Sequence, residues 1–188
     1  MSSAPRLLAF SGSTRRDSLN QKFLAVAVAV AREAGGEVTL LDLREFPLPL
    51  YDGDLEDASG LPENANKLVA LIKAHDALLL ASPEYNSMMT PLLKNTIDWC
   101  SRGGEDPFPG KVAAVLSASP GAYGGSRSLQ QTQQLLFKLG CHVVPGPCAL
   151  PQANKAFDAA GKLTDARAEK SVRALVAALI QATRKLSA

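Results

Sequence analysis

The stretch RLLAFSGSTRRDSLNQ, residues 6–21, decides the fold. It opens with a mostly apolar run, Arg6–Phe10, which predicts a buried strand. A polar turn follows, and the apolar periodicity of Ser18–Glu33 then predicts a helix that Gly35 and Gly36 end. A strand joined to a helix by a short turn is typical of an α/β protein with a parallel sheet.

The rest of the chain repeats this alternation of strands and helices. Continuous apolar runs favour strands that are covered on both faces. Five strand–helix units predict one doubly wound parallel sheet in the order 2-1-3-4-5, with helices on both faces. The segment 45–62 is rich in Pro, Gly and Asp and is expected to be a long surface loop. The further strands are expected at Glu37–Leu43, Ala77–Ser82, Lys111–Ser117 and His142–Val144 with its extension, and the further helices at Pro62–Ala74, Pro91–Arg102, Ser126–Leu139 and Asp165–Lys185.

Length and composition indicate a single globular domain over residues 1–188, with 46% apolar and 20% charged residues. A net charge of +2 without a Lys/Arg block does not favour nucleic acid. The apolar run 23–31 is too short to span a membrane. Three cysteines without metal-ligand spacing or an export signal predict reduced thiols, no bound metal and a cytoplasmic location.

A doubly wound sheet binds ligands beyond the carboxyl ends of its strands, where the strand order reverses. The turn after the first strand places hydrogen-bond donors there, next to the positive end of a helix. These groups favour a terminal phosphate. The candidates are Ser11, Ser13, Arg15, Ser18 and Asn20.

Two other readings of this turn stay open. Asp42 at the end of the second strand resembles a ribose-binding acid, although the chain has neither the G-x-G-x-x-G pattern nor a P-loop. Alternatively, Ser18 only caps its helix and the neighbouring arginines face solvent.

Two more polar loops follow the third and fourth strands. The first belongs to SPEYNSMMTPLLKNTIDW, residues 82–99, where a proline, a carboxylate, an aromatic face and an amide share one tight turn. The second is SASPGAYGGSRS, residues 117–128, whose glycines allow close backbone approach. Together with the first turn they form a layout that suits flavin mononucleotide (FMN), which has a phosphate tail and a flat ring.

Here the sequence resembles the NADPH-dependent FMN reductase family of flavodoxin-like proteins, which includes quinone, chromate and azo-dye reductases. The resemblance rests on GSTRRDSLN (residues 12–20), LPLYDGD (48–54) and the 82–99 stretch. It implies that the FMN phosphate is held by Ser13, Arg15, Ser18 and Asn20. The ring and ribityl chain would contact Pro83, Glu84, Tyr85 and Asn86, with Ser117 and Gly121 at the ring border. Glu84 and Tyr85 are the candidates for a catalytic role, as groups that shape the ring environment.

The implied function is an oxidoreductase that passes hydride from NADPH or NADH through bound FMN to a small acceptor in a ping-pong cycle. The acceptor would be a quinone, an azo compound, chromate or free flavin. Arg16 and Arg102 are candidates for the extra phosphate of NADPH. The resemblance also implies a homodimer or homotetramer, with residues 47–54 and the helix of Trp99 near a partner subunit.

Two other functions remain open for this fold. A non-enzymatic flavin electron carrier is usually strongly acidic, which this chain is not. A regulator that binds phosphate or a nucleotide without redox chemistry is also compatible, because fold alone does not define function.

Overall fold

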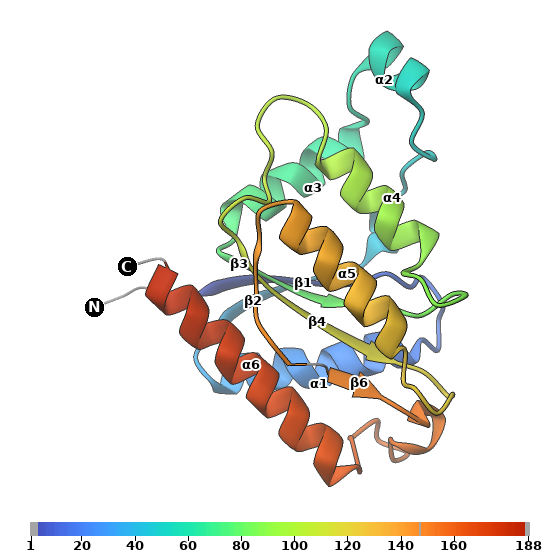
Figure 1. The fold of residues 1–188 in the computed structure, drawn as a ribbon, viewed down its shortest axis with the longest axis vertical. Helices are drawn as coiled ribbons and strands as arrows, with labels where there is room; N and C mark the ends of the chain where they lie inside the picture. Colours follow the sequence, from blue (N-terminus) through green and yellow to red (C-terminus); the bar gives the residue numbers. More distant parts are fainter. Residues whose placement is uncertain (1–3, 147, 187–188) are drawn as a thin grey trace.

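A parallel β-sheet forms the centre of the computed structural model, which describes residues 4–146 and 148–186 (Figure 1). Its order is β2-β1-β3-β4-β5, with β6 also paired to β4. The predicted order is confirmed, but two short strands fill the fifth position: β5 pairs with the start of β4 and β6 with its end. The strands are β1 (Arg6–Ser11), β2 (Glu37–Leu41), β3 (Ala77–Ala81), β4 (Val112–Ala118), β5 (His142–Val143) and β6 (Cys148–Leu150).

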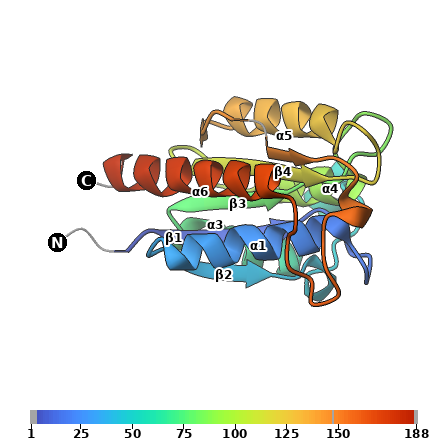
Figure 2. The same ribbon diagram turned by 90° about the horizontal axis from the view of Figure 1, so that it is seen from below.

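Helices cover both faces of the sheet (Figure 2). Side chains alternate along a strand, so Leu7 and Ala9 of β1 pack toward α1 and α6, whereas Leu8 and Phe10 pack toward α3, α4 and α5. None of the described helices is long and apolar enough to cross a membrane. The helices are α1 (Leu19–Glu33), α2 (Gly53–Ser59), α3 (Glu63–Ala74), α4 (Pro91–Cys100), α5 (Ser126–Lys138) and α6 (Ala166–Leu186), with 3₁₀ turns at Leu43–Glu45 and Ala153–Lys155.

Local capping explains where the helices begin and end. The Ser18 hydroxyl accepts from the Gln21 N–H at 3.3 Å and caps α1. Thr90 caps α4 by accepting from the Leu93 N–H at 3.2 Å, and Pro91 follows it. Observed bounds therefore differ from the predicted ones by only one or two residues.

The segment 45–62 is not entirely irregular, which corrects the prediction of a long loop. It contains α2, which projects from the body of the molecule (Figure 1). Asp52 caps this helix by accepting from the Asp54 N–H at 2.9 Å. No α2 residue is buried, so the sequence carries no apolar periodicity that could have indicated a helix there.

The segment before α2 is anchored on α4. Trp99 is fully buried, and its Nε1 donates to the Pro49 carbonyl at 2.9 Å. The Tyr51 ring packs edge-on against Trp99 with centroids 5.0 Å apart. Arg102 Nε donates to Glu56 at 2.9 Å, and its guanidinium lies 5.2 Å from the Tyr51 ring centroid. Both arginines considered for NADPH, Arg16 and Arg102, are exposed, but Arg102 is already paired with Glu56.

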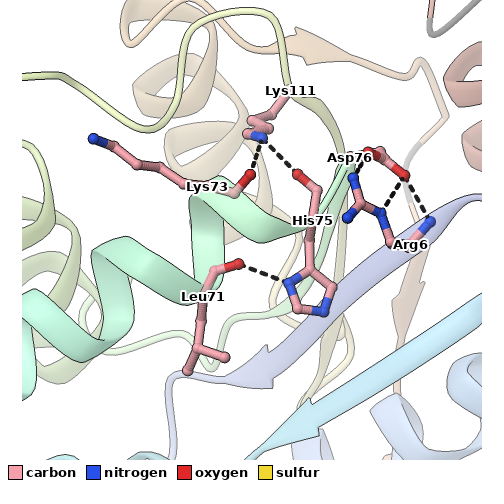
Figure 3. A network of polar contacts seen from close by, with 6 residues as sticks. All are labelled: Arg6, Leu71, Lys73, His75, Asp76 and Lys111. Atoms are coloured by element: carbon pink, nitrogen blue, oxygen red, sulfur yellow. Dashed lines mark hydrogen bonds and ion pairs between the residues drawn. The ribbon is translucent and has the colours of Figure 1, made fainter.

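The amino-terminal edge of the sheet is held by a polar network on the side opposite the strand ends considered above (Figure 3). The Asp76 carboxylate accepts three hydrogen bonds from Arg6: from its main-chain N–H at 2.9 Å, from Nε at 3.3 Å and from Nη2 at 2.8 Å. These bonds join β1 to the turn before β3.

His75 lies in the same network and is buried rather than at the surface. Its Nδ1 lies 2.6 Å from the Leu71 carbonyl, which can only accept, so Nδ1 carries the proton. The other nitrogen, Nε2, lies 2.8 Å from the Thr39 hydroxyl. Lys111 Nζ donates to the His75 carbonyl at 2.5 Å and the Lys73 carbonyl at 3.2 Å, which satisfies carbonyls at the end of α3.

Candidate functional site

A crevice lies at the carboxyl ends of β1, β3 and β4, where the three polar loops meet. The first loop and the start of α1 form one side, and the loops after β3 and β4 form the other. Because parallel strands end at the same edge, residues far apart in the sequence converge here. The lining residues are Ser13, Arg15, Ser18, Leu19, Asn20, Pro83, Glu84, Tyr85, Ala118, Ser119 and Pro120.

The first loop presents donors at the beginning of α1. Ser13 and Ser18 are buried, whereas Arg15 is exposed. Gln21 Nε2 donates to the Ser13 carbonyl at 2.8 Å and holds the loop on the helix. The first turn of α1 contains no acidic residue, so its positive end is not neutralised from within. This set of groups is suited to binding an anion.

Gly12 allows this loop to pack against α4. A Cβ at position 12 would lie 2.7 Å from the Leu93 Cβ and 2.8 Å from the Thr90 Oγ1. The Thr90 hydroxyl donates to the Gly12 carbonyl at 2.7 Å. Glycine is therefore required for the contact that sets this loop beside the loop after β3.

The loop after β3 contains a tight hairpin turn. Tyr85 and Met88 exchange main-chain hydrogen bonds of 2.9 and 3.0 Å. Between them Asn86 (φ +51°) and Ser87 (φ +68°) are both left-handed, the pattern of a type I′ turn. The turn leaves the Tyr85 side chain 49% exposed at the crevice, so an aromatic face is available to a ligand.

The carboxylate of Glu84 is directed toward α5. Its Oε2 accepts from the Arg127 N–H at 3.0 Å and the Ser128 N–H at 3.2 Å. Arg127 Nη1 lies 3.6 Å from Oε1. Gly125, the N-cap residue of α5, has no side chain to offer, and Glu84 satisfies these groups instead.

The loop after β4 is pressed against β6. A Cβ at Gly124, where φ is +60°, would lie 2.6 Å from the Leu150 carbonyl carbon. The Ser117 hydroxyl donates to the Gly124 carbonyl at 2.8 Å. Ser117 therefore supports the loop from below.

The crevice brings together most of the predicted cofactor residues, but four predicted residues do not line it: Ser11, Asn86, Ser117 and Gly121. Ser11 lies on the β1 face shared by Leu7 and Ala9, and it lines a separate hollow with Asp42 and Gln21. Its buried Oγ has no hydrogen-bond partner among the described residues. Asn86 is a turn residue, and the Gly121 N–H donates to the Ser119 hydroxyl at 3.1 Å.

Sequence reasoning missed four lining residues: Leu19, Ala118, Ser119 and Pro120. Ser119 and Pro120 directly follow β4, so the rule that ligands bind at strand ends could have found them. Asp42, the candidate ribose acid, instead caps the 3₁₀ turn, accepts from Arg44 Nε at 2.8 Å and lies outside the crevice.

The chain's thiols lie outside the crevice. Cys100, Cys141 and Cys148 are free and buried, and burial raises the pKa of each thiol to about 12. They are protonated at neutral pH and poor nucleophiles. Over residues 4–146 and 148–186, no three His, Cys, Asp or Glu side chains are grouped to hold a metal ion.

Comparison with protein families places the chain. Residues 5–155 match the family described as NADPH-dependent FMN reductase. The chain belongs to this family. The matched span includes all three loops of the crevice, which agrees with the resemblance seen in the sequence.

Individual proteins similar to this chain support its assignment to the FMN reductase family. An NAD(P)H-dependent FMN reductase of Pseudomonas aeruginosa is 38% identical over 187 residues, which are 99% of each chain. A quinone reductase of Pseudomonas putida is 38% identical over 156 residues, 82% of each chain. A solved structure of FerB from Paracoccus denitrificans, described as a flavoenzyme NAD(P)H:(acceptor) oxidoreductase, has a TM-score of 0.84 and 32% identity, and the match covers 97% of this chain and 98% of FerB.

Family membership confirms the predicted fold and the predicted class of enzyme, an NAD(P)H-dependent oxidoreductase with FMN. The roles of individual residues stay predictions.

Proposed function

We propose that this protein oxidises NADPH or NADH with bound FMN and reduces a small quinone-like acceptor, in a ping-pong cycle in which donor and acceptor use the same crevice in turn. Azo compounds, chromate and free flavin are further acceptors of this kind. The observation that carries the proposal is the crevice itself, with a helix start suited to an anion on one side and an exposed aromatic residue on the other. When bound, FMN supplies reversible hydride transfer.

The residues of the crevice fit the two ends of FMN. Ser13, Ser18 and the free N–H groups of α1 offer donors to a phosphate, and Arg15 offers a positive charge. Pro83 and Tyr85 offer apolar and aromatic surface to a flat ring. The chain's own contribution is to bind and orient these two ends and to leave one side of the ring open to substrates.

The names of the relatives support a small-molecule acceptor. The relatives from Pseudomonas putida and Escherichia coli are named quinone reductases. Tyr85, Met88 and Tyr123, in the loops after β3 and β4, are exposed and offer apolar surface to such an acceptor. We further propose that the protein works in the cytoplasm as a homodimer or homotetramer.

The test begins with the purified full chain and added FMN. We expect a yellow complex that oxidises NADPH faster when benzoquinone is added, with parallel lines in double-reciprocal plots. A yellow protein that leaves NADPH and NADH unoxidised would indicate an electron carrier. A protein that does not bind FMN would contradict the proposal.

A further inference from the structure

Glu84 joins two loops of the crevice that are far apart in the sequence. Its carboxylate belongs to the turn after β3, Pro83–Met89, and both of its main-chain partners lie in the first turn of α5. The glycine loop, Ser119–Gly125, leads directly into that helix. The Glu84 contacts therefore connect the turn after β3 to the glycine loop at the point where α5 begins.

A second, longer contact joins the same helix turn to the end of β3. The single proton of the Ser128 hydroxyl is shared between the Gly125 carbonyl at 2.9 Å and the Ser82 carbonyl at 3.3 Å. Ser82 and Glu84 flank Pro83, whose ring restricts the backbone between them. Two attachments on either side of a rigid residue leave the turn after β3 little freedom to move relative to α5.

The Glu84 carboxylate is also electrically compensated in this position. It faces the positive end of α5 and the guanidinium of Arg127, and its side chain is 15% exposed. Arg127 in turn lies 4.8 Å from the ring centroid of Tyr123 in the glycine loop. Both carboxylate oxygens thus have partners on α5, and a role in anchoring is favoured over proton transfer.

We propose that Glu84 is a positioning residue that sets the spacing between the Pro83–Met89 turn and the glycine loop, and with it the orientation of Tyr85 toward the flavin ring. The proposal rests on the proposed function, because it assumes that the crevice holds a flavin. Glu84 acts through Tyr85 and the two loops, and it transfers no proton.

The first test measures hydrogen exchange by NMR on the full chain as purified, in Glu84→Ala and Glu84→Gln. The Arg127 and Ser128 amides should exchange about tenfold or more faster in Glu84→Ala, because their acceptor is lost. In Glu84→Gln the remaining carbonyl oxygen can still accept, so exchange should stay within about threefold of the wild type. Unchanged exchange in Glu84→Ala would overturn the proposal whether or not the protein binds flavin.

The second test measures binding of FMN and of riboflavin, which lacks the phosphate. Glu84→Ala should raise the Kd of both by about tenfold and lower kcat/KM for NADPH, because the ring side of the crevice is disturbed. Glu84→Gln should restore both values to within about threefold of the wild type. Lost amide protection with unchanged flavin affinity and unchanged kcat/KM would overturn the positioning role.

Glu63 provides a matched control. It is also an acid at the start of a helix, but its side chain is 82% exposed and pairs with Lys67 on the same helix, α3. Glu63→Ala should leave flavin affinity and the exchange of both α5 amides at wild-type values. Failure of the proposed function would appear in the wild type as absent FMN binding or NADPH oxidation, whereas failure of this inference appears only in the Glu84 variants.

Discussion

Asn20 holds both main-chain groups of Ala118. Its Nδ2 donates to the Ala118 carbonyl at 2.8 Å, and its Oδ1 accepts from the Ala118 N–H at 3.0 Å. The pairing of β3 with β4 ends at Ala81 and Leu116, and the Asn20 side chain takes the place beside β4 that a longer β3 would fill. One buried side chain thus closes the sheet and ties the start of α1 to the crevice.

Replacing Asn20 should therefore destabilise the fold itself. In Asn20→Asp a carboxylate would face the Ala118 carbonyl, and we expect the free energy of unfolding to fall by about 2 kcal/mol. Urea unfolding without FMN measures this, since bound ligand would add stability of its own. Asn66→Asp is the control, because Asn66 is exposed and its side chain donates to the Leu61 carbonyl at 3.2 Å at the surface. Equal effects in both variants would contradict the role given to Asn20.

Arg15 and Ser18 should affect the phosphate end of FMN and not the ring, although Ser18 also caps α1. The double variant Arg15→Ala/Ser18→Ala should raise the Kd of FMN by about 100-fold, or about 2.7 kcal/mol, because it removes a charge and a hydroxyl donor. Riboflavin affinity should change by less than about threefold. Fluorescence titration with both flavins measures this, and Arg32→Ala, near the other end of α1, is the control. An FMN affinity equal to that of the wild type would refute a phosphate site at the start of α1.

Ser11 and Ser13 should behave differently although they are close in sequence. Ser13 lines the crevice, and Ser13→Ala should weaken FMN binding by about tenfold. The buried Ser11 hydroxyl lines the separate hollow beside Gln21 and Asp42, so Ser11→Ala should leave the Kd unchanged. Removing a hydroxyl without a partner among the described residues should also leave stability equal or raise it by up to about 1 kcal/mol. Equal losses of FMN affinity in the two variants would contradict this prediction and indicate that Ser11 also contacts FMN.

The Arg6–Asp76 pair should make stability depend on acid pH. Burial raises the pKa of Asp76, but the hydrogen bonds and charge of Arg6 outweigh it, and the pKa lies below its ordinary value of 3.8. A carboxyl group whose pKa is lowered by folding stabilises the protein at pH values above its ordinary pKa. This stability is lost as the pH falls through the pKa of the folded state. The free energy of unfolding of Asp76→Asn should therefore be about 1 kcal/mol lower than that of the wild type at pH 7. The difference should shrink below about pH 4.

Urea unfolding between about pH 3 and pH 7 tests this dependence. Glu105→Gln is the control, because the Glu105 side chain is 88% exposed and makes a surface pair with Lys73. A constant difference between Asp76→Asn and the wild type over the whole range would show that the ionised carboxylate contributes nothing.

The sequence predicts the layers of this fold well because apolar runs and helix caps are local signals. Ser18, Thr90 and Gly140 mark helix ends by their own chemistry, and the structure has helix ends there. The helix α2 carries no buried residue and could not be detected in this way. The break between β5 and β6 follows from how the chain meets β4, which no local pattern encodes.

For the site, the sequence predicts which loops meet but not where each side chain points. The face of β1 on which Ser11 lies could have been predicted, because the alternation of β1 puts it with Leu7 and Ala9. The direction of Glu84 could not, because its partners lie on α5 and are brought there only by the complete sheet.

The divided fifth strand has a consequence for self-association. An unbroken edge strand exposes a row of amide and carbonyl groups on which a neighbouring molecule can grow a continuous ladder. At this edge an incoming strand would meet two residues of β5, a gap in pairing, and then three residues of β6. At this edge an added strand would therefore find no paired segment longer than the three residues of β6, which leaves the unbroken β2, Glu37–Leu41, as the edge better suited to strand addition.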